Sequence, residues 1–138
     1  MKVREIITPK AQCTSPEATL MQCAAEMKSL DVGMLPICDD SRLVGAITDR
    51  DITVRAVARG LDPHTARVRE VMSEKIVYCF DDQEVEDAAQ IMEKMQIRRL
   101  PVLDHGKRLV GMVSLGDIAT RSQQDALAGH TLAGVSSH

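Results

Sequence analysis

Apolar and polar residues follow one order along the chain, and that order occurs twice within 138 residues. Its first element is a short extended stretch over 11–15. A helix is predicted next, because apolar residues recur at spacings of three and four and so share one helical face. These residues are Leu20, Cys23, Ala24, Met27 and Leu30. Thr19 and Gln22 have the spacing of a capping box and predict where this helix begins.

Two apolar runs, 35–38 and 43–48, come after this helix and flank a turn-prone Asp-Asp-Ser sequence. The pattern predicts a β-hairpin. A second helix is expected from near Asp49 to Arg59, because Gly60 suits the left-handed position that ends many helices.

The same series of elements returns in the second half of the chain. Val3-Arg4-Glu5-Ile6 recurs 65 residues later (68 − 3) as Val68-Arg69-Glu70-Val71, and one inserted residue then raises the shift to 66. The apolar face of the matching helix consists of Val85, Ala88, Ala89, Met92 and Met95. The predicted strands and last helix of this copy are 76–80, 100–103, 109–114 and a helix from near Gly116. Each copy is therefore a β-α-β-β-α unit.

The repeat sets the expected domain organisation. The first domain is 1–60, a linker covers 61–67, the second domain is 68–121, and a polar tail covers 122–138. A copy of about 60 residues buries too little surface for a comfortable core of its own. We therefore expect an α+β (α/β-like) fold in which the two copies pack with pseudo-two-fold symmetry as one module.

Four longer segments resemble the CBS-domain (cystathionine β-synthase domain) family. They read VREIITP, VREVMSE, GMLPICDDSRLVGAITDRD and IRRLPVLDHGKRLVGMVSLGD, and the resemblance spans 3–121. The first half is similar to the stand-alone hypoxic-response type of bacterial two-CBS protein. The resemblance implies a Bateman module, a CBS pair with two clefts that often bind AMP, ADP, ATP, NAD-like or S-adenosyl ligands. It also implies a homodimer that regulates a partner protein, which the sequence does not identify.

A ribose–phosphate motif of that family occurs in both copies, as Gly45–Asp51 and Gly111–Asp117. A hydroxyl, Thr48 or Ser114, stands where a strand meets a helix, and an aspartate follows three residues later. That carboxylate, Asp51 or Asp117, can accept two hydrogen bonds from the cis-diol of a ribose. The same spacing is also a capping box that stabilises a helix without any ligand.

The remaining ligand residues follow from the resemblance. Arg98 and Arg99 precede the second hairpin strand and are expected to contact phosphate, with Arg50 as a supplement, because guanidinium groups bind phosphate in a bidentate manner. The first copy has Gly33 and Met34 at the matching positions, so the two clefts are unequal. Adenine is expected between the first strands, whose residues are Thr14, Ser15, Pro16, Cys79, Phe80 and Asp81, above a floor of Ile37 and Val102.

Composition narrows the function classes. A net charge of −3 and only two aromatic side chains, Tyr78 and Phe80, argue against a nucleic-acid partner. The chain has no apolar run long enough for a membrane span and no apolar leader near its start, so a cytoplasmic location and no membrane partner are expected. Neither a catalytic constellation nor an obligatory cofactor is indicated. The predicted function is a non-catalytic sensor of adenine nucleotides, and the alternative is a ligand-free interaction dimer.

The cysteines suggest a possible disulfide, whereas the histidines do not suggest a metal site. Cys13 and Cys38 end two strands that are neighbours in CBS domains, so a redox-responsive disulfide is one interpretation and two reduced, buried thiols are the other. The histidines lack the spacing of metal ligands, so no metal site is expected: His64, His105, His130 and His138.

Overall fold

The computed structural model describes residues 1–9 and 13–121, with Arg121 described by its backbone alone. The predicted tail, 122–138, and part of the first predicted strand lie outside the described residues. The chain forms two compact units: unit 1 is Met1–Ala11 with Val77–His138, and unit 2 is Gln12–Ile76. Both contain helices and strands, which confirms the mixed class. Within the described part of the chain, every helix is too short or too polar to cross a membrane.

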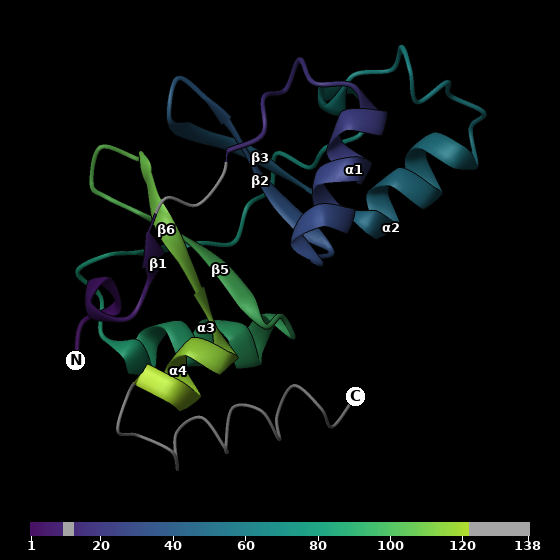
Figure 1. Cartoon of the computed structure of the whole chain (residues 1–138). Coiled ribbons are helices and arrows are strands. Elements are labelled where there is room, and N and C mark those ends of the chain that lie inside the picture. The colour runs from purple at the N-terminus through teal and green to yellow at the C-terminus, as the bar shows by residue number, and fades with distance from the viewer. Residues whose placement is uncertain (10–12, 122–138) are drawn as a thin grey trace. The chain divides into compact units, whose positions relative to one another are not determined.

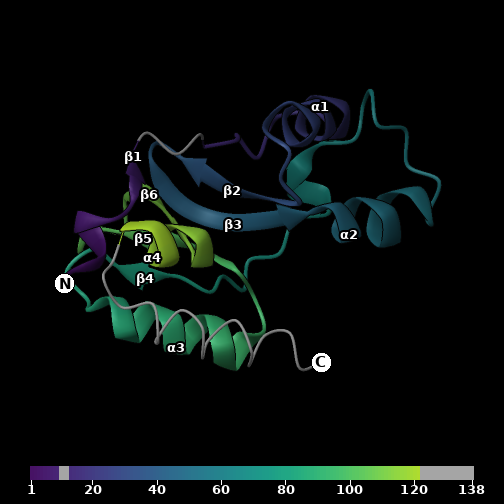
Figure 2. The same ribbon diagram turned by 60° about the horizontal axis from the view of Figure 1, so that its bottom comes forward.

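Unit 2 is built on an antiparallel hairpin, and two helical segments contribute to its core (Figure 2). Its elements are helix α1 (Leu20–Leu30), strands β2 (Met34–Asp39) and β3 (Arg42–Thr48), helix α2 (Asp49–Asp51), π-helix η2 (Ile52–Val57) and 3₁₀ turn η3 (Val68–Glu70). The predicted capping box of α1 is confirmed: the Gln22 N–H donates to Thr19 Oγ1 at 3.2 Å. Gly60 has the expected left-handed conformation, with φ of 72°.

Unit 1 has a four-stranded sheet in the order β1-β6-β5-β4. Two helices, α3 and α4, pack on it (Figure 1). Its elements are η1 (Val3–Glu5), β1 (Thr8–Pro9), β4 (Cys79–Phe80), α3 (Val85–Met95), β5 (Arg99–Leu103), β6 (Leu109–Ser114) and α4 (Leu115–Arg121). The second predicted hairpin is confirmed as β5 and β6.

The predicted apolar face of α3 is confirmed except at its last residue, and that of α1 is confirmed except at its last residue and at Ala24, which is exposed. Leu20, Cys23 and Met27 are buried on α1, but Leu30 is 44% exposed. On α3, Met95 is likewise 47% exposed. Each is the last residue of its helix, and the next residue turns left-handed, so the final turn leaves the surface that the helix covers.

The N-terminal segment of the chain packs on the second sequence repeat. We call residues 3–9 leader 1. The Val3 N–H donates to the Gln83 carbonyl at 2.8 Å, and the Arg4 N–H donates to the Asp81 carbonyl at 3.0 Å. Strand β1 then pairs with β6. The first segment of repeat one thus completes the sheet of repeat two.

The corresponding segment of the second repeat, residues 68–74, packs on the first repeat in the same way. We call it leader 2. The Val68 N–H donates to the Ala18 carbonyl at 2.8 Å, and the Arg69 N–H donates to the Pro16 carbonyl at 3.0 Å. The compact units therefore differ from the sequence repeats, because the repeats exchange their leaders.

The exchanged leaders explain the glycine that opens each ribose–phosphate motif. A Cβ on Gly111 would lie 2.8 Å from the Thr8 carbonyl oxygen of leader 1. A Cβ on Gly45 would lie 2.9 Å from the Ser73 carbonyl oxygen of leader 2. Both distances are shorter than van der Waals contact. Glycine is required at these positions by close backbone approach, independently of any ligand.

Candidate functional site

The two ribose–phosphate motifs have the same local geometry. In the second copy, the Asp117 N–H donates to Ser114 Oγ at 3.0 Å, and the Ser114 N–H donates to Asp117 Oδ2 at 3.0 Å. In the first copy, Thr48 and Asp51 make the same pair of hydrogen bonds, at 3.0 and 2.9 Å. Both motifs are therefore capping boxes, each made where a strand ends and a helix begins.

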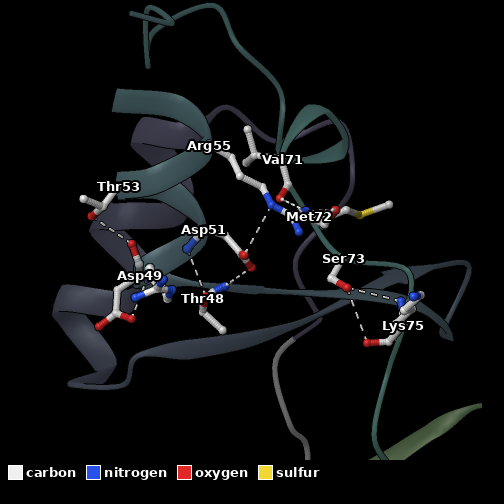
Figure 3. Close-up of polar contacts among 10 residues, drawn as sticks. Thr48, Asp49, Asp51, Thr53, Arg55, Val71, Met72, Ser73 and Lys75 are labelled. Carbon is white, nitrogen blue, oxygen red and sulfur yellow. Dashed lines mark hydrogen bonds and ion pairs between the residues drawn. The ribbon is translucent and has the colours of Figure 1, made fainter. Parts of the chain in front are cut away.

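In the first copy, Arg55 forms an ion pair with the second carboxylate oxygen of Asp51 (Figure 3). Arg55 Nε lies 3.9 Å from Asp51 Oδ1. The same guanidinium reaches leader 2, where Nη1 donates to the carbonyls of Val71 and Met72 at 3.4 and 3.5 Å. Arg55 thus links η2 to leader 2. It also balances the charge of Asp51, which leaves this carboxylate less able to bind a ligand.

In the second copy, an arginine stands directly beside the motif hydroxyl. Arg99 pairs in register with Ser114 across β5 and β6, so both side chains lie on one face of the sheet. Arg98 precedes it, and its carbonyl accepts the Leu115 N–H at 3.1 Å. Both arginine side chains are exposed, and neither has an ion-pair partner among the described residues. Arg99, Ser114 and Asp117 therefore form a mixed cationic and hydrogen-bonding group at one junction.

The first copy places different chemistry at the matching positions. Met34 pairs in register with Thr48, where the second copy has Arg99 and Ser114. Gly33 accepts the Asp49 N–H at 2.9 Å, and a Cβ there would lie 3.1 Å from Asp49 Oδ2. Arg50 is exposed, and its backbone N–H donates to Asp49 Oδ1 at 2.8 Å. Neutral Gly33 and Met34 thus replace the two arginines, and Asp49 adds a negative charge, which makes this junction a poorer site for a phosphate.

The predicted adenine-binding residues of the first copy make local contacts. Thr14 is buried and donates its hydroxyl to Glu26 Oε2 at 2.9 Å. Ser15 Oγ accepts the Glu17 N–H at 3.1 Å, and Pro16 accepts from leader 2. Glu26 was not predicted, because hydrophobic periodicity contains no information on which polar residue of α1 faces Thr14.

The predicted cleft floor and part of the second copy's adenine group lie in the core. Ile37 and Val102 are fully buried, and Cys79 is 1% exposed. Ile37 packs in the core of unit 2, Cys79 and Val102 pack in the core of unit 1, and none of them presents surface to a ligand. Asp81 is half-buried and its carbonyl accepts from leader 1.

Phe80 belongs to an aromatic cluster that the sequence interpretation missed. Its ring stacks on His105 with centroids 4.8 Å apart, and Tyr78 meets it edge-on at 5.6 Å. His105 Nε2 lies 2.7 Å from Asp82 Oδ2, and this contact raises the pKa of His105. The i, i+2 spacing of Tyr78 and Phe80 on an extended segment was the available signal, because such residues share a face.

All four cysteines are free thiols. Burial raises the pKa of Cys23 to about 11 and that of Cys79 to about 12, so both stay protonated. Cys13 is exposed, and Cys38 is buried. Burial, together with a hydrogen bond to Cys13, raises the pKa of Cys38.

Histidine and carboxylate groups do not gather into a metal site in the part of the chain that the structure describes. His64 Nδ1 contacts Asp62 Oδ1 at 3.1 Å, and His105 contacts Asp82. His130 and His138 lie outside the described residues.

A family model for the CBS domain matches the chain twice, at residues 3–57 and 68–123. The chain belongs to the CBS-domain family. The two matches coincide with the two sequence repeats, including the leaders, and confirm the resemblance seen in the motifs. Members similar over nearly their whole length include the CBS domain-containing protein YhcV of Bacillus subtilis (strain 168), 40% identical over 97% of this chain and 94% of the relative.

Hypoxic response protein 1 of Mycobacterium tuberculosis is 39% identical over 90% of this CBS-domain chain and 87% of the relative. The crystal structure of Hypoxic Response Protein I with two coordinated zinc ions is 38% identical, with a TM-score of 0.79, and covers 88% of this chain and 98% of that one. The CBS domain pair of protein MJ0100, in complex with 5-methylthioadenosine and S-adenosyl-L-methionine, is 30% identical. Its TM-score is 0.69, and the match covers 86% of this chain and 93% of that one.

Proposed function

We propose that this CBS-domain protein is a non-catalytic regulatory module that binds an adenine-type nucleotide, AMP, ADP or ATP, and signals to a protein partner. The observation that carries the proposal is the group of Arg99, Ser114 and Asp117 at the second strand–helix junction. A cis-diol and a phosphate are the two polar ends of a nucleotide. This group offers a carboxylate for the first and a guanidinium for the second.

Each residue of the group has a defined task. Asp117 uses Oδ2 for the helix cap, which fixes the carboxylate and leaves Oδ1 for the ribose hydroxyls. Arg99 is exposed and without an ion pair among the described residues, so phosphate binding breaks no existing salt bridge. Ser114 is half-buried between them and adds a hydroxyl.

We further propose that the second-copy site dominates. The first junction holds the same cap, but Arg55 already pairs with Asp51, and Met34 replaces the arginine next to the hydroxyl. A phosphate placed there would also meet the carboxylate of Asp49, which accepts a backbone hydrogen bond in place. The similar CBS domain pair of protein MJ0100 supports an adenosyl class of ligand, since its structure is a complex with two adenosine derivatives.

Signalling to the partner would follow from the coupling between ligand binding and the conformation of the module. A ligand that binds one arrangement of the module more tightly shifts the population toward it, and with it any surface that a partner reads. The proposal includes a homodimer, a cytoplasmic location and a partner whose identity stays open. The rival function is an interaction module that binds no nucleotide.

Thermal-shift and calorimetric titrations with AMP, ADP, ATP, NAD and S-adenosylmethionine test the proposal. A ligand at 100 times its Kd adds about 2.7 kcal/mol to the free energy of unfolding, a clear rise in Tm. Arg99→Met installs the first copy's residue and should weaken binding roughly 10-fold or more, because it removes a charged hydrogen-bond donor. Asp117→Asn keeps an acceptor for the cap and should weaken binding as well.

Arg50→Met is the matched control, because Arg50 is an exposed arginine at the other junction whose side chain has no hydrogen bond or ion pair among the described residues. It should leave affinity unchanged. The nucleotide function is wrong if no adenine ligand shifts Tm, and that result favours the interaction module. Equal affinity in Arg99→Met and Arg50→Met would contradict the assignment of the second junction.

A further inference from the structure

Two thiols from separate strands meet in unit 2. The Thr14 N–H donates to the Pro36 carbonyl at 3.1 Å, and the Cys38 N–H donates to the Thr14 carbonyl at 3.0 Å. Thr14 thus pairs in parallel with Ile37, which places Cys13 and Cys38 on the opposite face of this short ladder. Their side chains are near enough for Cys13 to contribute, after burial, to the raised pKa of Cys38.

The neighbouring residues hold Cys13 in this position. Thr14 has both backbone groups bonded to β2 and its hydroxyl bonded to Glu26 on α1. On the other strand, the β2–β3 register shifts between Ile37 and Cys38, because Val44 of β3 is the extra residue of a bulge opposite them. The contact between the thiols is therefore built into the local backbone.

The parallel ladder is longer in the second repeat than in the first. There the parallel ladder has two pairs, Cys79 with Val102 and Phe80 with Leu103, and the Asp81 N–H extends it to the Leu103 carbonyl at 2.9 Å. The residue of the first repeat that matches Asp81 is Pro16, which has no N–H to donate. The first repeat therefore stops at the single pair of Thr14 and Ile37.

We propose that Cys13 and Cys38 are a reversible redox site, in which a peroxide converts the thiol pair into an intramolecular disulfide. The bond takes the place of the ladder pairs that Pro16 prevents. This site is separate from the nucleotide group of the second copy and does not depend on it.

The exposed sulfur is the one that an oxidant reaches first. The Cys13 thiolate attacks hydrogen peroxide, the O–O bond breaks, and a sulfenic acid and hydroxide form. Cys38 then attacks the Cys13 sulfur, the S–O bond breaks, and water leaves with the Cys38 proton. Overall, two thiols lose two hydrogen atoms, and one hydrogen peroxide becomes two molecules of water. A small dithiol reverses the reaction by exchange.

The other two cysteines provide an internal control. Cys23 is fully buried and Cys79 is 1% exposed, and burial keeps both protonated. They should stay reduced under conditions that oxidise the proposed pair.

The test is a thiol count on the full chain, unfolded after treatment with hydrogen peroxide, together with peptide mass mapping. Two of the four thiols should disappear, and one peptide pair joined through Cys13 and Cys38 should appear. Dithiothreitol should restore all four. The oxidised protein should melt at least about 5 °C higher, because the bond closes a loop of 25 residues (38 − 13) in the unfolded chain.

Cys13→Ser is the first variant, because an exposed side chain tolerates the change, and it should keep its three thiols under the same treatment. Cys38→Ala provides a second arm: it should form no linked peptide pair and lose only the Cys13 thiol, because the sulfenic acid on Cys13 then has no second thiol to attack it. Four remaining thiols in the treated wild type would overturn the proposal. Oxidation of Cys13 to a sulfinic acid with Cys38 still free would do so too, as would a covalent dimer linked through Cys13.

Discussion

The two strand–helix junctions have the same capping box but differ in the residues that surround it. Thr48 with Asp51 and Ser114 with Asp117 form the same reciprocal cap, with all four hydrogen bonds at 2.9 to 3.0 Å. Around the first, Arg55 balances the aspartate and Met34 stands beside the hydroxyl. Around the second, Arg99 stands beside the hydroxyl without an ion pair among the described residues. A repeated motif therefore does not imply a repeated site.

The glycine that opens each motif is expected to have the largest effect when changed. Gly111→Ala should cost about 2–3 kcal/mol of unfolding free energy, because the new Cβ meets the Thr8 carbonyl and the branched side chain of Ile7. Gly45→Ala should cost less, about 1–2 kcal/mol, since one of its neighbours is the flexible Met72 side chain. Denaturant titration measures both.

Gly116→Ala serves as the control for those variants. Its Cβ would lie 3.6 Å from Ser114 Oγ, an ordinary contact within α4, so stability should stay equal or rise by up to about 1 kcal/mol. A similar loss in all three variants would contradict the role of the leaders, because only Gly45 and Gly111 lie under one.

The caps should respond equally in the two copies. Thr48→Ala and Ser114→Ala each remove a hydroxyl that accepts from the backbone, which costs about 1 kcal/mol. Thr48→Ser and Ser114→Thr keep the acceptor and are the matched controls. A clear difference between the two alanine variants in a denaturant titration would mean that the junctions are locally unequal, against the geometry.

The smallest effect should be a pH dependence from the pair of His105 and Asp82 in the second repeat. Asp82 raises the pKa of His105 above 6.5, so their pair stabilises the folded state fully below that pH. The stabilisation is lost as pH rises through the raised pKa. His105 also lowers the pKa of Asp82, so the contribution of the carboxylate is lost only as pH falls below its usual 3.8.

The matching residue of the first repeat, Glu17, pairs instead with Arg69, which keeps its charge throughout this range. Tm measured from pH 5 to 9 should therefore fall slightly with rising pH in the wild type and less in His105→Gln. A pH profile that is unchanged in His105→Gln would place the titrating group elsewhere.

Periodicity and turn chemistry were sufficient for the local elements. The helix over Leu20–Leu30, its cap at Thr19, both hairpins and the left-handed Gly60 depend on residues close in sequence, so the pattern of a single chain contains them. The π-helix over Ile52–Val57 was not predicted. Its counterpart in the second repeat is an α-helix, and we have no sequence signal that separates the two.

The sequence by itself determined the doubled β-α-β-β-α plan, the CBS family and the two caps, because each depends on short-range spacing that repeats at 65 or 66 residues. Tertiary structure alone decided which leader covers which repeat and where Arg55 and Glu26 point. These features join residues far apart in the chain, and their partners are selected by backbone approach and burial. The contrast between the two junctions belongs to this second group, since the caps are encoded locally and their surroundings come from the fold.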